Sequence, residues 1–180
     1  MEINVAQRDV RTTFLGGFAG QMVSSLVWFV SAALATWSSP RAGIIAVVVA
    51  GIFIFPMTLL LLRFMGHGTG LAAGHPMNGL GRQVAFMLPL NLPLVAAAAL
   101  FRLNWFYPAL MIALGSHYLP FIFMYGMWQF GVLAAALIGG GVVLALYFPS
   151  IFSLGAWITA SLLLVFAFVG RGVALRDQRA

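Results

Sequence analysis

The sequence predicts an all-α protein, a polytopic transmembrane bundle of six helices with both termini cytoplasmic. Between Thr13 and Gly170 lie six apolar stretches, each close to the ~20 residues that cross a hydrocarbon layer of ~30 Å. None of the nine basic and three acidic side chains has to lie deep inside a stretch. The stretches lack the period-two alternation of barrel strands, and lipid offers the backbone no hydrogen-bond partner, so they are expected to be helices.

The expected helices follow the positions of the charged residues along a single transmembrane domain. The first follows the polar segment 1–12 and is too long for a signal-peptide core, so we interpret it as a retained helix. Arginines mark the ends of the next three, whereas the uncharged linker 148–150 between the last two makes them the weakest assignments. The expected ranges are 13–37, 42–63, 83–101, 105–126, 129–148 and 151–170.

The number of arginines on each side predicts the orientation. An even number of crossings puts both termini on one side, and loops rich in arginine stay in the cytoplasm. The terminus side carries Arg8, Arg11, Arg63, Arg82, Arg171, Arg176 and Arg179. The other side carries Arg41 and Arg102. We also expect aromatic belts, with Trp37, Trp105, Tyr107 and Tyr147 at the outer interface and Tyr125 and Trp128 at the inner one.

Composition excludes several classes of protein. A chain that is 63% hydrophobic and 7% charged would expose more apolar surface than a soluble monomer tolerates. The net charge of +6 does not favour nucleic acid as a partner, because the arginines are spread over helix ends rather than gathered on one face. The absence of cysteine excludes disulfides and thiolate metal sites.

The connection 64–82 is rich in glycine, which favours an irregular backbone. It is either a flexible linker or a loop that grips a ligand. His67 and His75 lie in it, but two imidazoles without a carboxylate or thiol nearby form an incomplete coordination sphere. We therefore predict no metal site and no cofactor.

His117 is the most unusual residue of the chain, because it lies near the middle of an expected membrane helix. Intramembrane ionisable groups are costly and often functional. Pro120 lacks an N–H and leaves the carbonyl of Ser116 without its helical partner, which predicts a kink beside the imidazole. The alternative is that neutral His117 only hydrogen-bonds another helix and holds the bundle together.

Further polar residues are expected at a comparable depth. Asn91 lies between Pro89 and Pro93, whose helix should be broken and face protein or a wet cavity. We predict one buried cluster of Gln21, Asn91 and His117. Additional candidate members are Ser24, Ser25, Ser116 and Tyr118, and Pro56 predicts a further kink.

The predicted cluster contains no carboxylate, so a neutral polar pathway suits an uncharged or zwitterionic small solute. We therefore predict a small-solute transporter or channel-like protein and assign no catalytic residue. One alternative is a membrane-embedded lipid-binding protein or an enzyme that uses His117. Another is a scaffold subunit without a solute. Membrane lipids are expected partners in each case.

Small residues form rows along two of the expected helices. Gly16, Gly20 and Ser24 are spaced four residues apart, as are Ala135 and Gly139. Such rows let helices approach closely. They serve either packing within the bundle, which we favour, or the seam of a homo-oligomer.

Residues 74–126 resemble a family of uncharacterised bacterial multi-pass membrane proteins, a domain of unknown function. The resemblance rests on the segment that begins Gly74-His75-Pro76 and on the G-x-H-x-L-P segment that begins at Gly115. It implies a location in the bacterial inner membrane but no reaction. The residues it singles out are His75, Pro76, Pro108, Gly115, His117 and Pro120.

Overall fold

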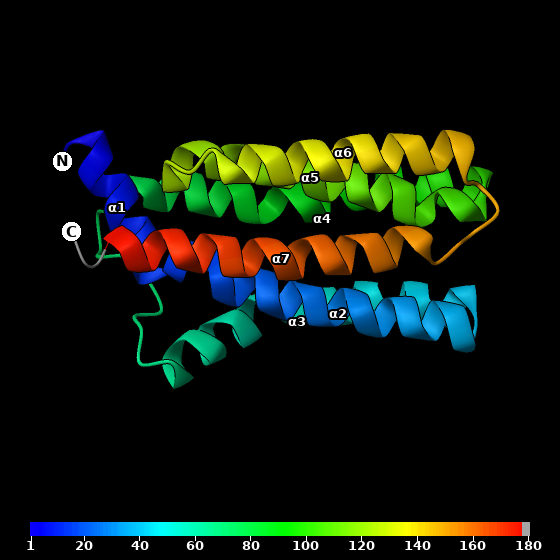
Figure 1. The fold of residues 1–180 in the computed structure, drawn as a ribbon, viewed down its shortest axis with the longest axis horizontal. Helices are drawn as coiled ribbons and strands as arrows, with labels where there is room; N and C mark the ends of the chain where they lie inside the picture. The colour runs from blue at the N-terminus through cyan, green and yellow to red at the C-terminus, as the bar shows by residue number, and fades with distance from the viewer. Residues whose placement is uncertain (178–180) are drawn as a thin grey trace.

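The computed structural model describes residues 1–177 and contains seven α-helices in that range (Figure 1). Six of them are long and apolar enough to cross a membrane, which confirms the predicted all-α bundle. Arg179 lies outside the described residues. The helices are α1 (Ile3–Thr13), α2 (Phe18–Trp37), α3 (Pro40–Phe64), α4 (Met77–Phe101), α5 (Phe106–Tyr125), α6 (Gln129–Tyr147) and α7 (Leu154–Asp177).

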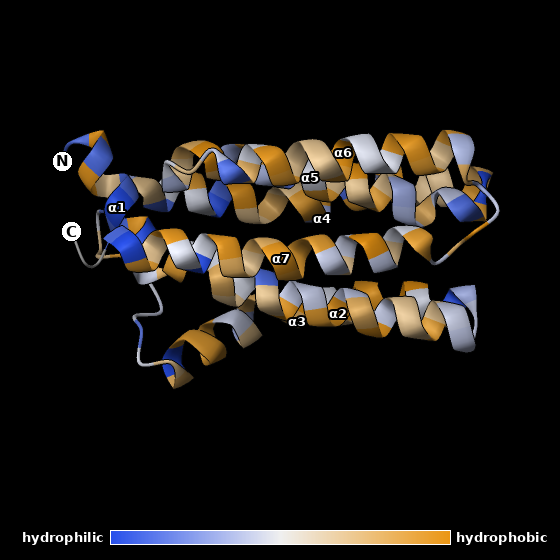
Figure 2. Cartoon of the chain, in the orientation of Figure 1, coloured by the Kyte–Doolittle hydropathy of each residue, from blue (hydrophilic) through white to orange (hydrophobic). Residues whose placement is uncertain are grey.

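The start of α1 and the end of α7 lie at the same end of the bundle, as predicted (Figure 1). We call this the terminal end and the opposite one the far end. Figure 2 shows hydrophobic residues along the long helices and hydrophilic residues gathered on α1 and on the last turns of α7. The compartment that the terminal end faces remains a prediction.

The first helix, α1, was not predicted, because segment 1–12 was interpreted only as polar. Its two buried residues, Ala6 and Val10, are one helical turn apart and therefore lie on the same face. They belong to the main core, and α1 packs against α5 and α7. α1 therefore covers the terminal end of the bundle.

A break separates α1 from α2, so the expected start of a helix at residue 13 is wrong. Leu15, Gly16 and Gly17 all have positive φ angles, of 50°, 62° and 84°. Gly16 therefore lies outside α2, and its predicted row with Gly20 does not continue along one helix. Its backbone instead lies against Gly170 of α7, where a Cβ on Gly16 would come 2.2 Å from the Gly170 carbonyl oxygen. The contact supports the interpretation of packing within the bundle for this glycine.

The connection between α3 and α4 is shorter than predicted. α4 begins at Met77 instead of residue 83, although Gly79 and Gly81 lie in its first turns. The reason is a capping interaction: Met77 N–H donates to His75 Nδ1 at 3.2 Å, next to a proline at the N-cap. The glycine-rich loop therefore covers residues 65–76 rather than 64–82.

The remaining boundaries differ from the expected ones by a few residues. Ser39 Oγ accepts the Ala42 N–H and starts α3 at Pro40, a favoured first helical residue. Gly126 ends α5 with a φ of 62°. α7 runs to Asp177, beyond the expected end at residue 170, so its last turns extend past the apolar stretch.

The long helices form two groups that α7 holds together (Figure 1). α2 packs against α3, and α5 packs against both α4 and α6. α7 packs closely on α2 and also contacts α5 and α6. One bond across the first of these contacts runs from Ser25 Oγ to the Ala160 carbonyl, at 2.8 Å and fully buried. α3 and α4 lie at the edges and expose most of their apolar side chains, as lipid-facing helices do.

Glycine brings α5 and α6 together. A Cβ on Gly115 would lie 2.7 Å from Ile138 Cγ1, and one on Gly141 would lie 2.7 Å from the Pro108 carbonyl oxygen. On α6 the close contact therefore occurs at Gly141. Gly139 has no neighbour within 4 Å of a Cβ position.

Candidate functional site

His117 is half-buried on α5, and its Nδ1 is buried without a hydrogen-bond partner among the described residues. The imidazole lies next to the backbone of Val84 on α4. It also packs against aromatic rings, with centroid distances of 5.7 Å to Tyr118 and 5.2 Å to Phe121. The residue therefore lies between the backbone of α4 and an aromatic cluster.

Gln21 is buried on α2, near the terminal end of that helix, with only 3% of its surface exposed. Its Oε1 has no hydrogen-bond partner among the described residues. Ser24 and Ser25 are buried beside it, and Ser25 bonds to α7 as described above. A buried amide oxygen without a partner costs ~1–3 kcal/mol, which marks Gln21 as a position that needs an explanation.

Asn91 lies farther toward the far end than His117. Val84, which neighbours His117, precedes Asn91 by two helical turns, or roughly 10 Å along α4. Asn91 Nδ2 donates to the Met87 carbonyl of its own helix at 2.7 Å. In residues 1–177 no hydrogen bond joins any two of Gln21, Asn91 and His117. Their shared role in a pathway therefore stays a prediction.

The other candidate residues have identifiable surroundings. Ser116 Oγ donates to the Ile112 carbonyl of its own helix at 2.9 Å. The four prolines expected at kinks, Pro56, Pro89, Pro93 and Pro120, all lie inside helices. The last turns of α3, which follow Pro56, turn away from the line of α2 (Figure 1). His67 is half-buried, whereas His75 is buried.

Thr159 on α7 is a polar residue that the sequence analysis missed. It is fully buried, and its Oγ1 has no hydrogen-bond partner within the described chain. The available signal was a threonine in the middle of an apolar helix. Threonine is frequent in membrane helices because its hydroxyl can bond to its own backbone, so the sequence alone did not single it out.

An aromatic cluster occupies the interface of α5 and α6 toward the terminal end. Phe130 of α6 lies 5.9, 5.3 and 5.0 Å, between ring centroids, from Tyr118, Phe121 and Tyr125 of α5. Tyr118, Tyr125 and Phe130 are buried. The prediction that Tyr125 belongs to an interfacial belt is therefore wrong, because its ring packs into this cluster. Trp128, by contrast, is 70% exposed, as a belt residue is expected to be.

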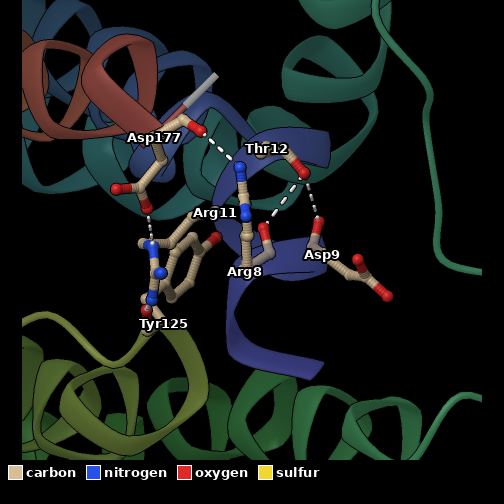
Figure 3. A network of polar contacts seen from close by, with 6 residues as sticks. All are labelled: Arg8, Asp9, Arg11, Thr12, Tyr125 and Asp177. Carbon is tan, nitrogen blue, oxygen red and sulfur yellow. Dashed lines mark hydrogen bonds and ion pairs between the residues drawn. The ribbon is translucent and has the colours of Figure 1, made fainter. Parts of the chain in front are cut away.

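A network of polar contacts covers this cluster at the terminal end (Figure 3). Arg11 of α1 forms an ion pair with Asp177, with 2.6 Å between Nε and Oδ2, and donates from Nη1 to the Tyr125 carbonyl at 2.6 Å. Arg8 donates to the Asp177 carbonyl at 2.8 Å. Gln7 donates to the Phe123 carbonyl at 2.6 Å. We call these contacts the clasp, because they tie α1 to the ends of α5 and α7.

A second buried node joins α2, α3 and α5 near the far end. Ser31 Oγ donates to the Gly43 carbonyl at 2.9 Å and lies 2.6 Å from the Tyr107 hydroxyl. Because Ser31 has one hydroxyl proton, Tyr107 is the donor to Ser31. Tyr107 is fully buried, so its predicted place in the outer belt is wrong. Trp37 and Tyr147 are 76% and 73% exposed, consistent with a belt.

Comparison with known proteins identifies the family. A model described as "Family of unknown function (DUF7010)" matches residues 3–171. The chain belongs to this family. The match extends well beyond residues 74–126, on which the resemblance from the sequence rested. No curated protein and no solved structure was found to match the chain.

The DUF7010 chain is thus a multi-pass membrane protein with buried polar atoms at the interfaces of its helices. The partnerless atoms inside the spans include an amide oxygen, an imidazole nitrogen and a hydroxyl oxygen, on α2, α5 and α7. Within residues 14–176 the sequence has no acidic residue. Such groups can exchange hydrogen bonds with a neutral solute or water.

Proposed function

We propose that the protein is a small-solute transporter or channel-like protein whose pathway is lined by buried polar groups of α2, α5 and α7. The observation that carries the proposal is the set of buried, partnerless atoms Gln21 Oε1, His117 Nδ1 and Thr159 Oγ1. In lipid such atoms have no solvent to satisfy them. Hydrogen bonds with a passing solute or with water would offset their cost. Asn91, Ser116 and Tyr118 remain candidate pathway residues.

The chemistry of these groups favours an uncharged or zwitterionic solute. An amide, an imidazole and a hydroxyl offer hydrogen bonds of both polarities without a fixed charge. The acidic side chains are Glu2, Asp9 and Asp177, all near the ends of the chain, so the spans offer no carboxylate for a bare cation.

The two polar nodes would act as the closures of the pathway. The clasp and the aromatic cluster close the terminal end, and the Ser31–Tyr107–Gly43 node closes the far end. Both are built from a few hydrogen bonds of about 1 kcal/mol each, which is a barrier that a conformational change can cross. The resemblance to bacterial proteins adds the inner membrane as the proposed location.

The test is solute entry into liposomes that contain the purified protein. Liposomes shrunk by hyperosmotic additions of glycerol, urea, glycine or sucrose, all at the same osmolarity, re-swell at a rate that light scattering measures. We expect at least one uncharged or zwitterionic solute to enter faster than it enters protein-free liposomes. Gln21→Leu and His117→Leu should reduce that entry severalfold, because each removes a pathway hydrogen-bonding group.

The matched control is Ser161→Ala, which also removes a hydroxyl from a membrane helix. Ser161 is exposed and bonds only to the Trp157 carbonyl of its own helix, so its loss should leave entry unchanged. Entry no faster than through protein-free liposomes for every solute would refute the proposal. Equal effects of Ser161→Ala and Gln21→Leu would also contradict it.

A further inference from the structure

We propose that a pocket at the start of α4 binds the phosphate of a phospholipid in the leaflet at the terminal end. This inference does not rest on the transport proposal. The pocket has a volume of about 470 Å³ and is lined by Gly74, His75, Asn78, Gly79 and Arg82. Every lining residue is either polar or a glycine, which is unusual for a surface so near the lipid-facing part of a helix.

The pocket collects hydrogen-bond donors that suit a phosphate. The first N–H groups of a helix have no partner within it and favour an anion. In α4 the N–H of Met77 goes to His75 Nδ1, and that of Asn78 goes to the His75 carbonyl. The next N–H belongs to Gly79, which lines the pocket and has open space where a side chain would be.

Arg82 supplies the charge. It is exposed, lines the pocket, and makes no ion pair or hydrogen bond with any residue in the range 1–177. An arginine guanidinium fits a phosphate with two parallel hydrogen bonds. Asn78 keeps a second amide hydrogen for a ligand, because Nδ2 donates only to the Ala72 carbonyl, at 3.0 Å.

His75 forms a buried wall of the pocket and limits where the phosphate can lie. Its side chain is 3% exposed, and its Nε2 makes no hydrogen bond in the described structure. Since Nδ1 accepts the Met77 N–H, the neutral ring carries its proton on Nε2, 3.5 Å from Asp9 Oδ2. The carboxylate repels an anion placed against this ring. The phosphate is therefore assigned to the side of Gly79 and Arg82.

The surface beyond the pocket indicates that the phosphate belongs to a lipid. Phe86, Leu90 and Leu94 follow Arg82 at intervals of four residues, and they are 65%, 74% and 69% exposed. Side chains at this spacing share one face of a helix. A headgroup on Arg82 would thus place its acyl chains along an apolar stripe of α4. A soluble phosphate compound has no acyl chain that would pack against such a stripe.

The experiment measures lipid retained by the purified protein. The protein is exchanged into phosphatidylcholine nanodiscs that contain a minority of phosphatidylglycerol, then released and analysed by native mass spectrometry. We expect one phosphatidylglycerol to stay bound to the wild type. Arg82→Gln should reduce its retention severalfold, and addition of inorganic phosphate should not displace it from the wild type.

Arg63→Gln is the matched control, because Arg63 is also an exposed arginine at the terminal end but does not line the pocket. It should retain the lipid as the wild type does. Equal losses in the two variants would show diffuse attraction between arginines and lipid and would overturn the site. Retention unchanged by Arg82→Gln would overturn it as well. Displacement by inorganic phosphate, with Arg82-dependent binding of phosphate alone, would assign the pocket to a soluble ligand instead.

Discussion

At the scale of single residues, two glycines bring backbone segments together, Gly16 before α2 and Gly170 on α7. Their backbones meet where α7 passes the break between α1 and α2. Without side chains on either residue, the two segments approach closely enough for dispersion forces to act between backbone atoms. The contact anchors the last helix to the start of the first membrane span.

Gly170→Ala should therefore destabilise the protein. A Cβ at this position would lie 2.3 Å from the Gly16 carbonyl oxygen, which is backbone and cannot rotate away. We expect a loss of about 1–3 kcal/mol in the free energy of unfolding, as in overpacked cores. Unfolding by sodium dodecyl sulfate in mixed micelles, followed by tryptophan fluorescence, measures it.

Gly172→Ala is the control on the same helix. No atom lies within 4 Å of its Cβ position, so the added methyl group should be neutral or should stabilise the helix by up to ~1 kcal/mol. If both variants lost the same stability, the loss would come from the substitution of a helical glycine rather than from the contact with Gly16.

Residue types in the sequence predicted which side chains would be unusual but not how they are satisfied. Gln21 and His117 were singled out because polar groups are costly in lipid, and both retain buried atoms without partners. The position of Asn91 along α4 relative to His117 could not be predicted, because it depends on how far one helix slides along another. The hydroxyl of Tyr107 was placed at the membrane surface because tyrosine usually lies there. Only the tertiary structure shows that this hydroxyl has a buried partner, Ser31.

At the scale of elements, α1 is the part that the sequence analysis missed. Its buried residues, Ala6 and Val10, lie on the apolar face of an amphipathic segment, a signal that was missed because segment 1–12 was interpreted only as polar. What fixes the helix is the clasp, in which Arg11 bridges Asp177 and the Tyr125 carbonyl. Contacts more than a hundred residues apart along the chain leave no mark in the local sequence.

Arg11→Gln should loosen α1 without unfolding the bundle. The substitution removes one partly exposed ion pair and shortens the donor that reaches Tyr125, a loss of about 1 kcal/mol. Hydrogen exchange of the α1 amides should accelerate roughly fivefold, while exchange in α5 and α6 stays unchanged. Mass spectrometry of peptic fragments measures both.

The comparison variant is Arg176→Gln, which removes an exposed arginine that makes no polar contact with other described residues. It should leave the exchange of α1 unchanged. Asp177→Asn should accelerate hydrogen exchange of the α1 amides in the wild type. In the Arg11→Gln background it should add a smaller acceleration, since the two residues share one interaction. If the effects of the two substitutions on the free energy of opening of α1 were fully additive, the ion pair would not hold α1.

The helix boundaries could be predicted where a local feature of the sequence sets them. Ends set by a local signal were close to the expected positions, as at Arg102 and at Gly126. The start of α4 was missed because glycines suggested a loop, whereas His75 caps the helix through its side chain. A histidine is a rare helix cap, so the residue type alone did not predict this role.

At the scale of the whole molecule, we predict that reporters fused at both termini are cytoplasmic. Arginines are concentrated on the loops at the terminal end and in the terminal segments, and this bias sets the orientation of membrane helices. Green fluorescent protein should fluoresce at either terminus, and alkaline phosphatase should be inactive there. Phosphatase inserted in the α6–α7 connection should be active. Opposite compartments for the two termini would contradict an even number of crossings.

The number of membrane-spanning helices could be predicted because it follows from hydrophobic length. Their lateral arrangement could not be, because membrane helices recognise one another by small residues and shape rather than by a hydrophobic stripe. Nothing in the row Gly16, Gly20 and Ser24 indicated that its first member would contact α7 and its second would approach Thr58 of α3.

The place of α7 between the two groups of helices has a consequence for biogenesis. A ribosome makes α7 after the other six helices, so the groups that it joins enter the membrane before their common neighbour exists. Until then the α2–α3 hairpin lacks the Ser25–Ala160 bond, and Gly16 lacks its contact with the backbone of Gly170. During that interval an insertase or chaperone in the bilayer has a defined surface of α2 to shield.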